Sequence, residues 1–218
     1  MKKYLIPIIV LLALSVCTTT SFALVYDFRS LEAFSALHGQ IGGTFTVDGI
    51  PSEVRAGLMN ASGDFNLGGG SATLAISPFT DAGLGVVSTS GNDQVNADTF
   101  IFGLSDGVVF NFDPLFAPEE ITLTKFFNGE DIRIFVNGVY FGDFLGTASG
   151  EETISLGAEM ISTLAVTTLG DDSPLASSDD SDYYVANIRG TVVPEPSTML
   201  LLGSGLAGLV GFRRKFRG

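Results

Sequence analysis

The middle of the chain consists of short runs of β-branched and aromatic residues, separated by glycine, proline, aspartate or asparagine. Such runs predict strands, because these side chains suit an extended backbone and the separating residues suit turns. In one run, Ile121, Leu123 and Phe127 share a face, on which Lys125 is the polar position. Many short strands with turn-rich spacing indicate an all-β body, a β-sandwich or a jelly roll. Strands are expected at residues 24–28, 44–48, 54–59, 72–76, 85–89, 99–103, 108–112, 121–127, 132–136, 139–141, 161–168 and 183–192.

One hairpin is predicted directly by a turn motif. Asn137-Gly138 separates the alternating runs 132–136 and 139–141. Asn-Gly is the preferred pair for a type I′ turn, in which both central residues have positive φ. These two runs should therefore form a tight antiparallel hairpin.

One short helix is expected at residues 30–37. Ser30 can cap its N-terminus and Gly39 can end it. The apolar face of this helix would consist of Leu31, Phe34 and Leu37. Five phenylalanines of the strands are expected in the core: Phe110, Phe112, Phe126, Phe127 and Phe135.

The first residues have the pattern of a secretory signal peptide. A positive start with Lys2 and Lys3 is followed by an apolar run at 4–16, which is too short to span a hydrocarbon core of roughly 30 Å. Small residues then precede an expected cut between Ala23 and Leu24 by signal peptidase, after transport by the general secretion machinery. A competing cut lies before Cys17, as in a lipoprotein.

The last residues have the pattern of a single transmembrane helix. The stretch 198–212 is apolar and would reach about 22 Å as a helix, and long basic side chains after it can extend its reach. The basic end should remain on the cytoplasmic side of the membrane. A plain tail anchor explains the helix and the charges, but not the Pro-Glu-Pro before them. The basic end consists of Arg213, Arg214, Lys215 and Arg217.

Residues 194–218 resemble the PEP-CTERM sorting signal of Gram-negative bacteria. Pro194, Glu195 and Pro196 match its name-giving motif, and the apolar stretch and basic end follow in the same order. The resemblance implies recognition and processing by exosortase, a membrane transpeptidase-like enzyme. It also implies a precursor anchored in the inner membrane and a final place at the cell surface or in the extracellular matrix, in association with extracellular polysaccharide.

These patterns divide the chain into a signal peptide at 1–23, an exported β-sandwich domain at 24–193 and a sorting signal at 194–218. The exported part carries 23 acidic and five basic residues, a formal charge near −18. Such a charge argues against nucleic-acid binding, which depends on basic side chains that neutralise phosphates. After a cut at Ala23 the exported chain has no cysteine, and therefore no disulfide or thiolate chemistry.

Catalytic chemistry has little support in the sequence. His38 is the single histidine, and a polar position at the end of a helix explains it better than a role as catalytic base. Adjacent acidic residues could serve a glycosidase, but they are expected to lie in turns as solvated acids. The chain also lacks tryptophan, the usual platform for sugar rings. These acidic pairs are Glu119-Glu120, Glu130-Asp131, Glu151-Glu152, Asp171-Asp172 and Asp179-Asp180.

Calcium binding is a possible use of two oxygen-rich segments, 170–182 and 91–98. Neither has the spacing of an EF-hand, and flexible, solvated acidic loops explain both segments better than calcium binding does. No other cofactor is expected. The sequence therefore predicts a non-enzymatic exported surface or matrix protein sorted by exosortase. A carbohydrate- or calcium-binding module and a polysaccharide hydrolase are the alternatives.

Overall fold

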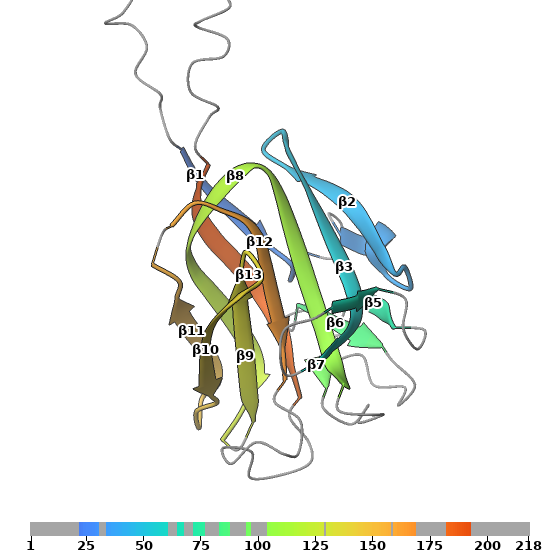
Figure 1. The fold of residues 1–218 in the computed structure, drawn as a ribbon, viewed down its shortest axis with the longest axis vertical. Coiled ribbons are helices and arrows are strands. Elements are labelled where there is room, and N and C mark those ends of the chain that lie inside the picture. Colours follow the sequence, from blue (N-terminus) through green and yellow to red (C-terminus); the bar gives the residue numbers. More distant parts are fainter. Residues whose placement is uncertain are drawn as a thin grey trace, which may run out of the picture. The chain divides into compact units, whose positions relative to one another are not determined.

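A computed structural model describes residues 22–30, 34–60, 65–67, 72–76, 83–87, 95–96, 104–128, 130–157, 159–168 and 182–192 (Figure 1). Residues 23–192 form one compact unit. The described residues are strands joined by turns, so the all-β prediction is confirmed. The strands are β1 (Phe22–Asp27), β2 (Gly42–Val47), β3 (Ile50–Asn60), β4 (Phe65–Leu67), β5 (Thr73–Ile76), β6 (Leu84–Val87), β7 (Val95–Asn96), β8 (Leu104–Phe126), β9 (Asp131–Val136), β10 (Val139–Leu145), β11 (Gly150–Ser155), β12 (Ile161–Thr167) and β13 (Asp182–Val192).

Strand β8 is the longest element, with 23 residues, and belongs to both layers of the sandwich. Its first half pairs with β3 and β12, up to Phe112 opposite Ser52. Its second half pairs with β11 and β13 from Phe116 onward. Figure 1 shows the strand arching over between these halves. The two layers are therefore continuous through one strand, which makes the sandwich a nearly closed sheet.

The first layer runs in the order β10, β9, β12, β8 and β3, with β2 and β4 along the outer edge of β3. The second layer places β13 between β8 and β6, with β5 beyond β6. Strand β11 pairs with the other side of β8, and β1 and β7 also pair with β13. Figure 1 shows β1 beginning beside the end of β13, so the first and last strands of the body share one end of the sandwich.

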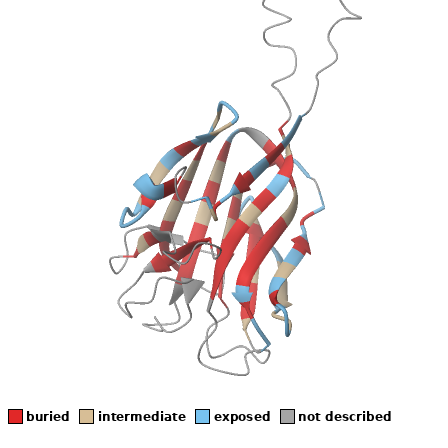
Figure 2. Cartoon of the chain, turned by 180° about the vertical axis from the view of Figure 1, so that it is seen from behind, coloured by how far each residue is buried: buried red, intermediate tan, exposed pale blue. Residues whose placement is uncertain are grey.

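The interior between the layers is filled by apolar side chains. Figure 2 shows buried positions along the central strands, whereas the flanking strands carry most of the exposed positions. Aromatic rings dominate part of this core, and Tyr26 lies among them with its ring centroid 5.3–5.7 Å from those of three phenylalanines. Its buried hydroxyl is hydrogen-bonded to Ser52 Oγ at 2.9 Å. The remaining rings of this cluster are Phe28, Phe34, Phe45, Phe110, Phe112 and Phe116.

The hairpin prediction at Asn137-Gly138 is confirmed. Asn137 has φ 51° and Gly138 φ 75°, and Val136 pairs with Val139 across the turn. Asn137 also ties the turn to β12, because its Oδ1 accepts hydrogen bonds from the backbone amides of Ser162 at 2.9 Å and Thr163 at 3.2 Å. Asparagine therefore serves both the turn conformation and the docking of the hairpin.

The predicted face of residues 121–127 is wrong beyond Leu123. Lys125 has φ +60°, and the register against β11 jumps there, since Phe126 faces Gly150 and Thr124 faces Glu151. This one-residue bulge reverses the alternation, so that Phe126 is fully buried and Phe127 is 47% exposed. The four other predicted core phenylalanines are buried. The ring of Phe127 lies over Gly150, which leaves no room for a side chain there.

Other expectations are corrected in detail. Residues 31–33 of the helix expected at 30–37 lie outside the described residues, and the described part contains a 3₁₀ turn, η1 (Ser35–Leu37), without a side-chain cap. Gly39 follows this turn with φ +75°. The runs 108–112 and 121–127 are two parts of β8 instead of separate strands. Strands β4, β7 and β11 were not predicted, and the strand expected at 99–103 lies outside the described residues.

The bulge at Lys125 gives a testable prediction. A non-glycine residue at positive φ is strained, so Lys125→Gly should raise the free energy of unfolding by about 1 kcal/mol, and Lys125→Val should lower it by about 1–2 kcal/mol. Urea denaturation followed by circular dichroism measures both changes. Arg189→Gly is the control, because Arg189 is exposed on β13 at an ordinary strand φ, where glycine should destabilise. A Lys125→Gly variant less stable than the wild type would contradict the bulge.

Candidate functional site

The residues predicted for sorting lie mostly outside the described residues. This holds for Pro194, Glu195 and Pro196 and for the whole basic end. Ala23 and Leu24 are both in β1, where Ala23 is exposed and Leu24 is 1% exposed. An N-terminus at Leu24 would therefore begin within the first strand of the body. The basic end consists of Arg213, Arg214, Lys215 and Arg217.

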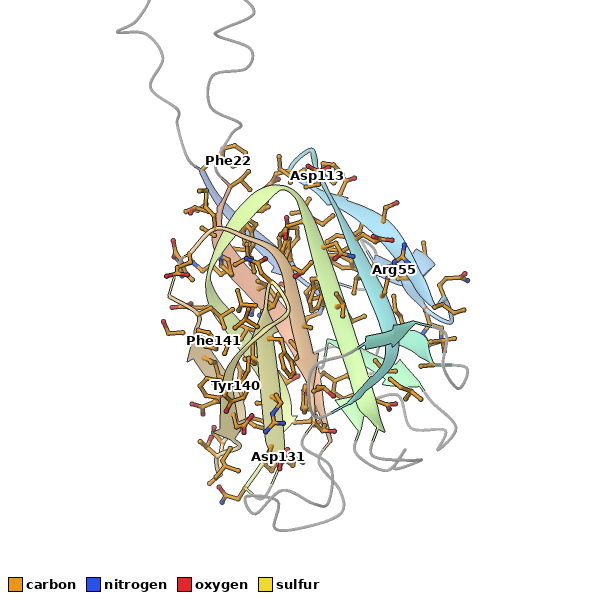
Figure 3. The ribbon with its side chains drawn as sticks, in the orientation of Figure 1. Phe22, Arg55, Asp113, Asp131, Tyr140 and Phe141 are labelled. Carbon is orange, nitrogen blue, oxygen red and sulfur yellow. The ribbon has the colours of Figure 1, made fainter. Side chains whose placement is uncertain are left out.

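Within the described residues, a partly exposed aromatic and ionic cluster lies on the β9–β10 hairpin. The guanidinium of Arg133 in β9 donates two hydrogen bonds to Asp143 in β10, at 2.7 Å from Nε to Oδ1 and 2.8 Å from Nη2 to Oδ2. Arg133 Cζ also lies 5.3 Å from the ring centroid of Tyr140, which is 53% exposed. The ring of Tyr140 packs edge-on against buried Phe135 at 6.2 Å. We call Arg133, Phe135, Tyr140 and Asp143 the hairpin cluster; Tyr140 is labelled in Figure 3.

The charges of the hairpin cluster reinforce one another. Hydrogen bonds from Arg133 hold the pKa of Asp143 below its ordinary value, and the same bonds raise the pKa of Arg133. Partial desolvation raises the pKa of Tyr140, and its hydrogen bond with Asp143 raises it further. At neutral pH the cluster therefore presents a fixed ion pair beside a neutral phenol, because each shift favours the form already present.

A bulge creates this arrangement. The turn sets Val136 opposite Val139 and Phe135 opposite Tyr140, so a regular hairpin would place Gly142 opposite Arg133. The register shifts between Tyr140 and Gly142, and Asp143 faces Arg133 instead. The sequence analysis did not identify the cluster. From the Asn-Gly turn, the pairing of Phe135 with Tyr140 could have been predicted. The turn gives no indication of the extra residue in β10 that places Asp143 opposite Arg133.

The hairpin cluster has the chemistry of a shallow site for a hydroxylated ligand. A half-exposed aromatic ring offers an apolar face, and the adjoining carboxylate and guanidinium can accept and donate hydrogen bonds at fixed positions. Strand β10 is also the edge of its layer and carries further exposed apolar side chains, with Phe141 41% and Val139 68% exposed. Tyr140 thus supplies an aromatic platform in a chain without tryptophan.

The acidic pairs are not all solvated turn residues, as the sequence suggested. Glu119-Glu120 lies within β8 and Glu151-Glu152 within β11. Glu130-Asp131 begins β9, and Asp131 is completely buried. Asp171-Asp172 and Asp179-Asp180 lie outside the described residues. His38 follows the 3₁₀ turn and is exposed, as the polar interpretation expected.

The oxygen-rich segments considered for calcium also lie largely outside the described residues, apart from β7 and the first residue of β13. Among the residues that the structure describes, no three acidic, histidine or cysteine side chains gather into a metal-binding group. In the same part of the chain, no helix has the length and apolar character needed to cross a membrane.

Two solved structures are similar to this chain at low identity. One is a GH31 CBM32-2 bound to GalNAc, which is 13% identical and aligns over 80% of this chain and 99% of its own length with a TM-score of 0.30. The other holds the CBM51-2 and INT domains of ZmpB from Clostridium perfringens, at 11% identity over 71% of this chain and 41% of its own, with a TM-score of 0.29. Similarity of this degree assigns neither a ligand nor an activity to the chain. No curated protein matches the sequence significantly.

A family match is found at residues 192–215, which fit the PEP-CTERM protein-sorting motif. The matched stretch begins with the last residue of β13 and contains the Pro-Glu-Pro motif, the apolar stretch and the first three residues of the basic end. The motif implies export and processing by exosortase. The chain therefore carries a PEP-CTERM protein-sorting motif.

Proposed function

We propose that this chain is a non-enzymatic surface or extracellular-matrix protein whose β-sandwich is the exported cargo. The observation that supports this proposal is the sorting motif at residues 192–215. In the precursor, residues 198–212 span the inner membrane as a helix and the basic end lies on the cytoplasmic side. Exosortase detaches the body near Pro194, and the released body joins the cell surface or the extracellular polysaccharide.

The proposal includes a signal peptide at residues 1–23. Its support is the charged start, the short apolar run and the small residues before Leu24. The body fits export in two further respects. It contains no cysteine after Ala23, and its buried core supplies the stability that disulfides give to smaller exported domains.

The second candidate function is carbohydrate binding, and the hairpin cluster favours it. An exposed tyrosine ring can pack against the apolar face of a sugar, while Asp143 and Arg133 contact its hydroxyl groups. This function is compatible with the first, since a matrix protein that binds polysaccharide would be retained in the matrix after its release.

The sorting proposal predicts a processing defect. Replacing Pro194, Glu195 and Pro196 together by alanine leaves the apolar stretch and basic end unchanged, so the precursor should keep its orientation and accumulate uncleaved in the inner membrane of a host that has exosortase. Cell fractionation and the intact mass of the body measure this. Neutral replacements of all four basic residues should instead weaken the retention of the precursor in the membrane and the orientation of its helix, before any processing. These residues are Arg213, Arg214, Lys215 and Arg217. If the triple-alanine protein were trimmed and released like the wild type, the Pro-Glu-Pro motif would not be a processing signal, and the segment would be only a membrane anchor.

The export proposal predicts the N-terminus of the mature protein. Signal peptidase should cut after Ala23, because the small side chains of Ser21 and Ala23 fit the positions that it recognises. N-terminal sequencing of the secreted body should therefore begin at Leu24. Ala23→Tyr is expected to block this cut and leave a longer protein. A mature chain that begins with a lipidated Cys17 would contradict the prediction.

The carbohydrate proposal predicts that binding depends on one ring. Tyr140→Ala should weaken binding to the host exopolysaccharide by about tenfold, whereas Tyr140→Phe keeps the ring and most of the affinity. Affinity electrophoresis in gels containing the polysaccharide measures both. Phe141→Ala is the control, because Phe141 is exposed on the same strand outside the cluster. Equal retardation of the wild type and Tyr140→Ala would exclude the hairpin cluster as the binding site.

A further inference from the structure

The outward face of the first layer reaches the solvent across its central strands. On β3, β8 and β12, buried positions alternate with partly exposed ones, as in Val54 and Arg55 on β3 or Phe110 and Asn111 on β8. The buried positions belong to the core between the layers. Because successive side chains of a strand point to opposite faces, the partly exposed positions lie on the side of the sheet that faces away from the core.

Strand register aligns these outward positions into two rows. The first row crosses β3, β8, β12, β9 and β10 in the order Arg55, Val109, Ala165, Phe135 and Tyr140. The second row crosses β3, β8 and β12 in the order Glu53, Asn111 and Thr163. We call these eight residues the transverse surface. Figure 3 shows the two ends of the first row, Arg55 and Tyr140, on opposite sides of the body.

A second ionic cluster lies at the β3 end of the transverse surface. Nε of Arg55 donates a hydrogen bond of 2.7 Å to Oε1 of Glu53, and Nδ2 of Asn111 donates one of 3.2 Å to Oε2. We call these three residues the β3 cluster. All three are partly exposed, and their guanidinium, carboxylate and amide groups have more donors and acceptors than these bonds use. The β3 cluster thus repeats the ionic chemistry of the hairpin cluster, without an aromatic ring.

Small side chains form the middle of the transverse surface. Val109, Ala165 and Thr163 lie between the two clusters, and all three are partly exposed although β8 and β12 are paired on both sides. Neighbouring strands are about 4.8 Å apart, so the four steps from β3 to β10 separate the two clusters by about 19 Å. Hydrogen-bonding groups at both ends of such a surface suit a ligand that is extended.

The transverse surface is locally neutral in a strongly acidic body. The exported part has a formal charge near −18, but here Arg55 is paired with Glu53, and beside the first row Arg133 is paired with Asp143. A nucleic acid would need unpaired basic side chains, and a protein partner would need large apolar anchors in the middle of its interface. An uncharged polymer rich in hydroxyl groups needs neither, so it fits this surface best.

We propose that the transverse surface binds an extended segment of an uncharged polysaccharide, held at one end by the hairpin cluster and at the other by the β3 cluster. This inference rests on the carbohydrate-binding function proposed above and adds the direction and the length of the ligand. One sugar ring packs on Tyr140, the next rings lie over Ala165 and Val109, and hydroxyl groups further along contact the β3 cluster. Both clusters are built on strands, so little order has to be gained on binding.

The test measures binding of exopolysaccharide fragments, partially hydrolysed and separated by length, to the full chain purified in detergent. By isothermal titration calorimetry, affinity should rise with fragment length until a fragment spans about 19 Å, and then level off. Val109→Lys places a long side chain in the middle of the surface. It should weaken the binding of long fragments by about tenfold and leave the shortest fragments unaffected. Val109→Ala keeps the middle small and should retain the wild-type affinity.

The control for the added charge is Ser155→Lys, because Ser155 is exposed on β11 in the other layer. It should bind all fragments like the wild type. Circular dichroism melting curves check that each variant is folded, and Ala165→Lys is the second blocking variant. Affinity should change by less than about twofold between low and high salt, since screening does not affect an uncharged ligand. A steep loss of affinity with salt would contradict the uncharged polymer.

Asn111→Ala tests the β3 cluster alone. The variant removes one amide while Arg55 still holds Glu53, so long fragments should bind about threefold more weakly and the shortest fragments unchanged. Tyr140→Ala should instead weaken the binding of every fragment. This difference separates the two ends of the transverse surface.

Three outcomes would overturn the inference. If Tyr140→Ala weakens binding but Val109→Lys and Asn111→Ala bind long fragments like the wild type, carbohydrate binding stands and the transverse surface is not its site. If the wild type binds fragments of no length, the carbohydrate function and the transverse surface fail together. In analytical ultracentrifugation, a dimeric wild type and a monomeric Val109→Lys variant would assign the surface to a second copy of the chain.

Discussion

Backbone hydrogen bonding along β8 is the constraint on which the rest of the body depends. Its first half pairs with β3 and β12, one on each edge. Beyond the bend, its second half pairs with β13 and β11, so both edges of the strand are occupied there as well. The strand therefore fixes the register of four neighbours in two layers. A slip of one residue would move Val108, Phe110 and Ile121 from the core to the opposite face together, so the register is strongly specified.

The bend in β8 explains why the sequence predicted two strands where there is one. The runs 108–112 and 121–127 have separate apolar patterns, and Pro114 lies between them. Proline lacks the amide hydrogen that a central ladder position needs, so a break was the natural expectation. At this point, however, the pairing of β8 with β3 ends and its pairing with β13 has not yet begun. Local pattern identified the strands but could not show which of them share a backbone.

Bulges account for most of what could not be predicted. Alternation along 121–127 and the turn at Asn137-Gly138 were readable, because each depends on neighbouring residues. The extra residues at Lys125 and near Phe141 depend on pairing with distant strands, and they decide that Phe127 is exposed and that Asp143 faces Arg133. The sorting motif was readable for the same reason as the turn, since its parts follow one another in sequence.

The position of β13 has a consequence for the timing of folding. This strand lies between β8 and β6 and also pairs with β1, yet it is the last strand described in the chain. A chain made from its N-terminus presents β1 long before this partner is available. Until residues 182–192 have been made, the second layer lacks its middle, and contacts of such long sequence separation form slowly. The order of the strands thus delays closure of the sandwich until the segment next to the sorting motif has joined it.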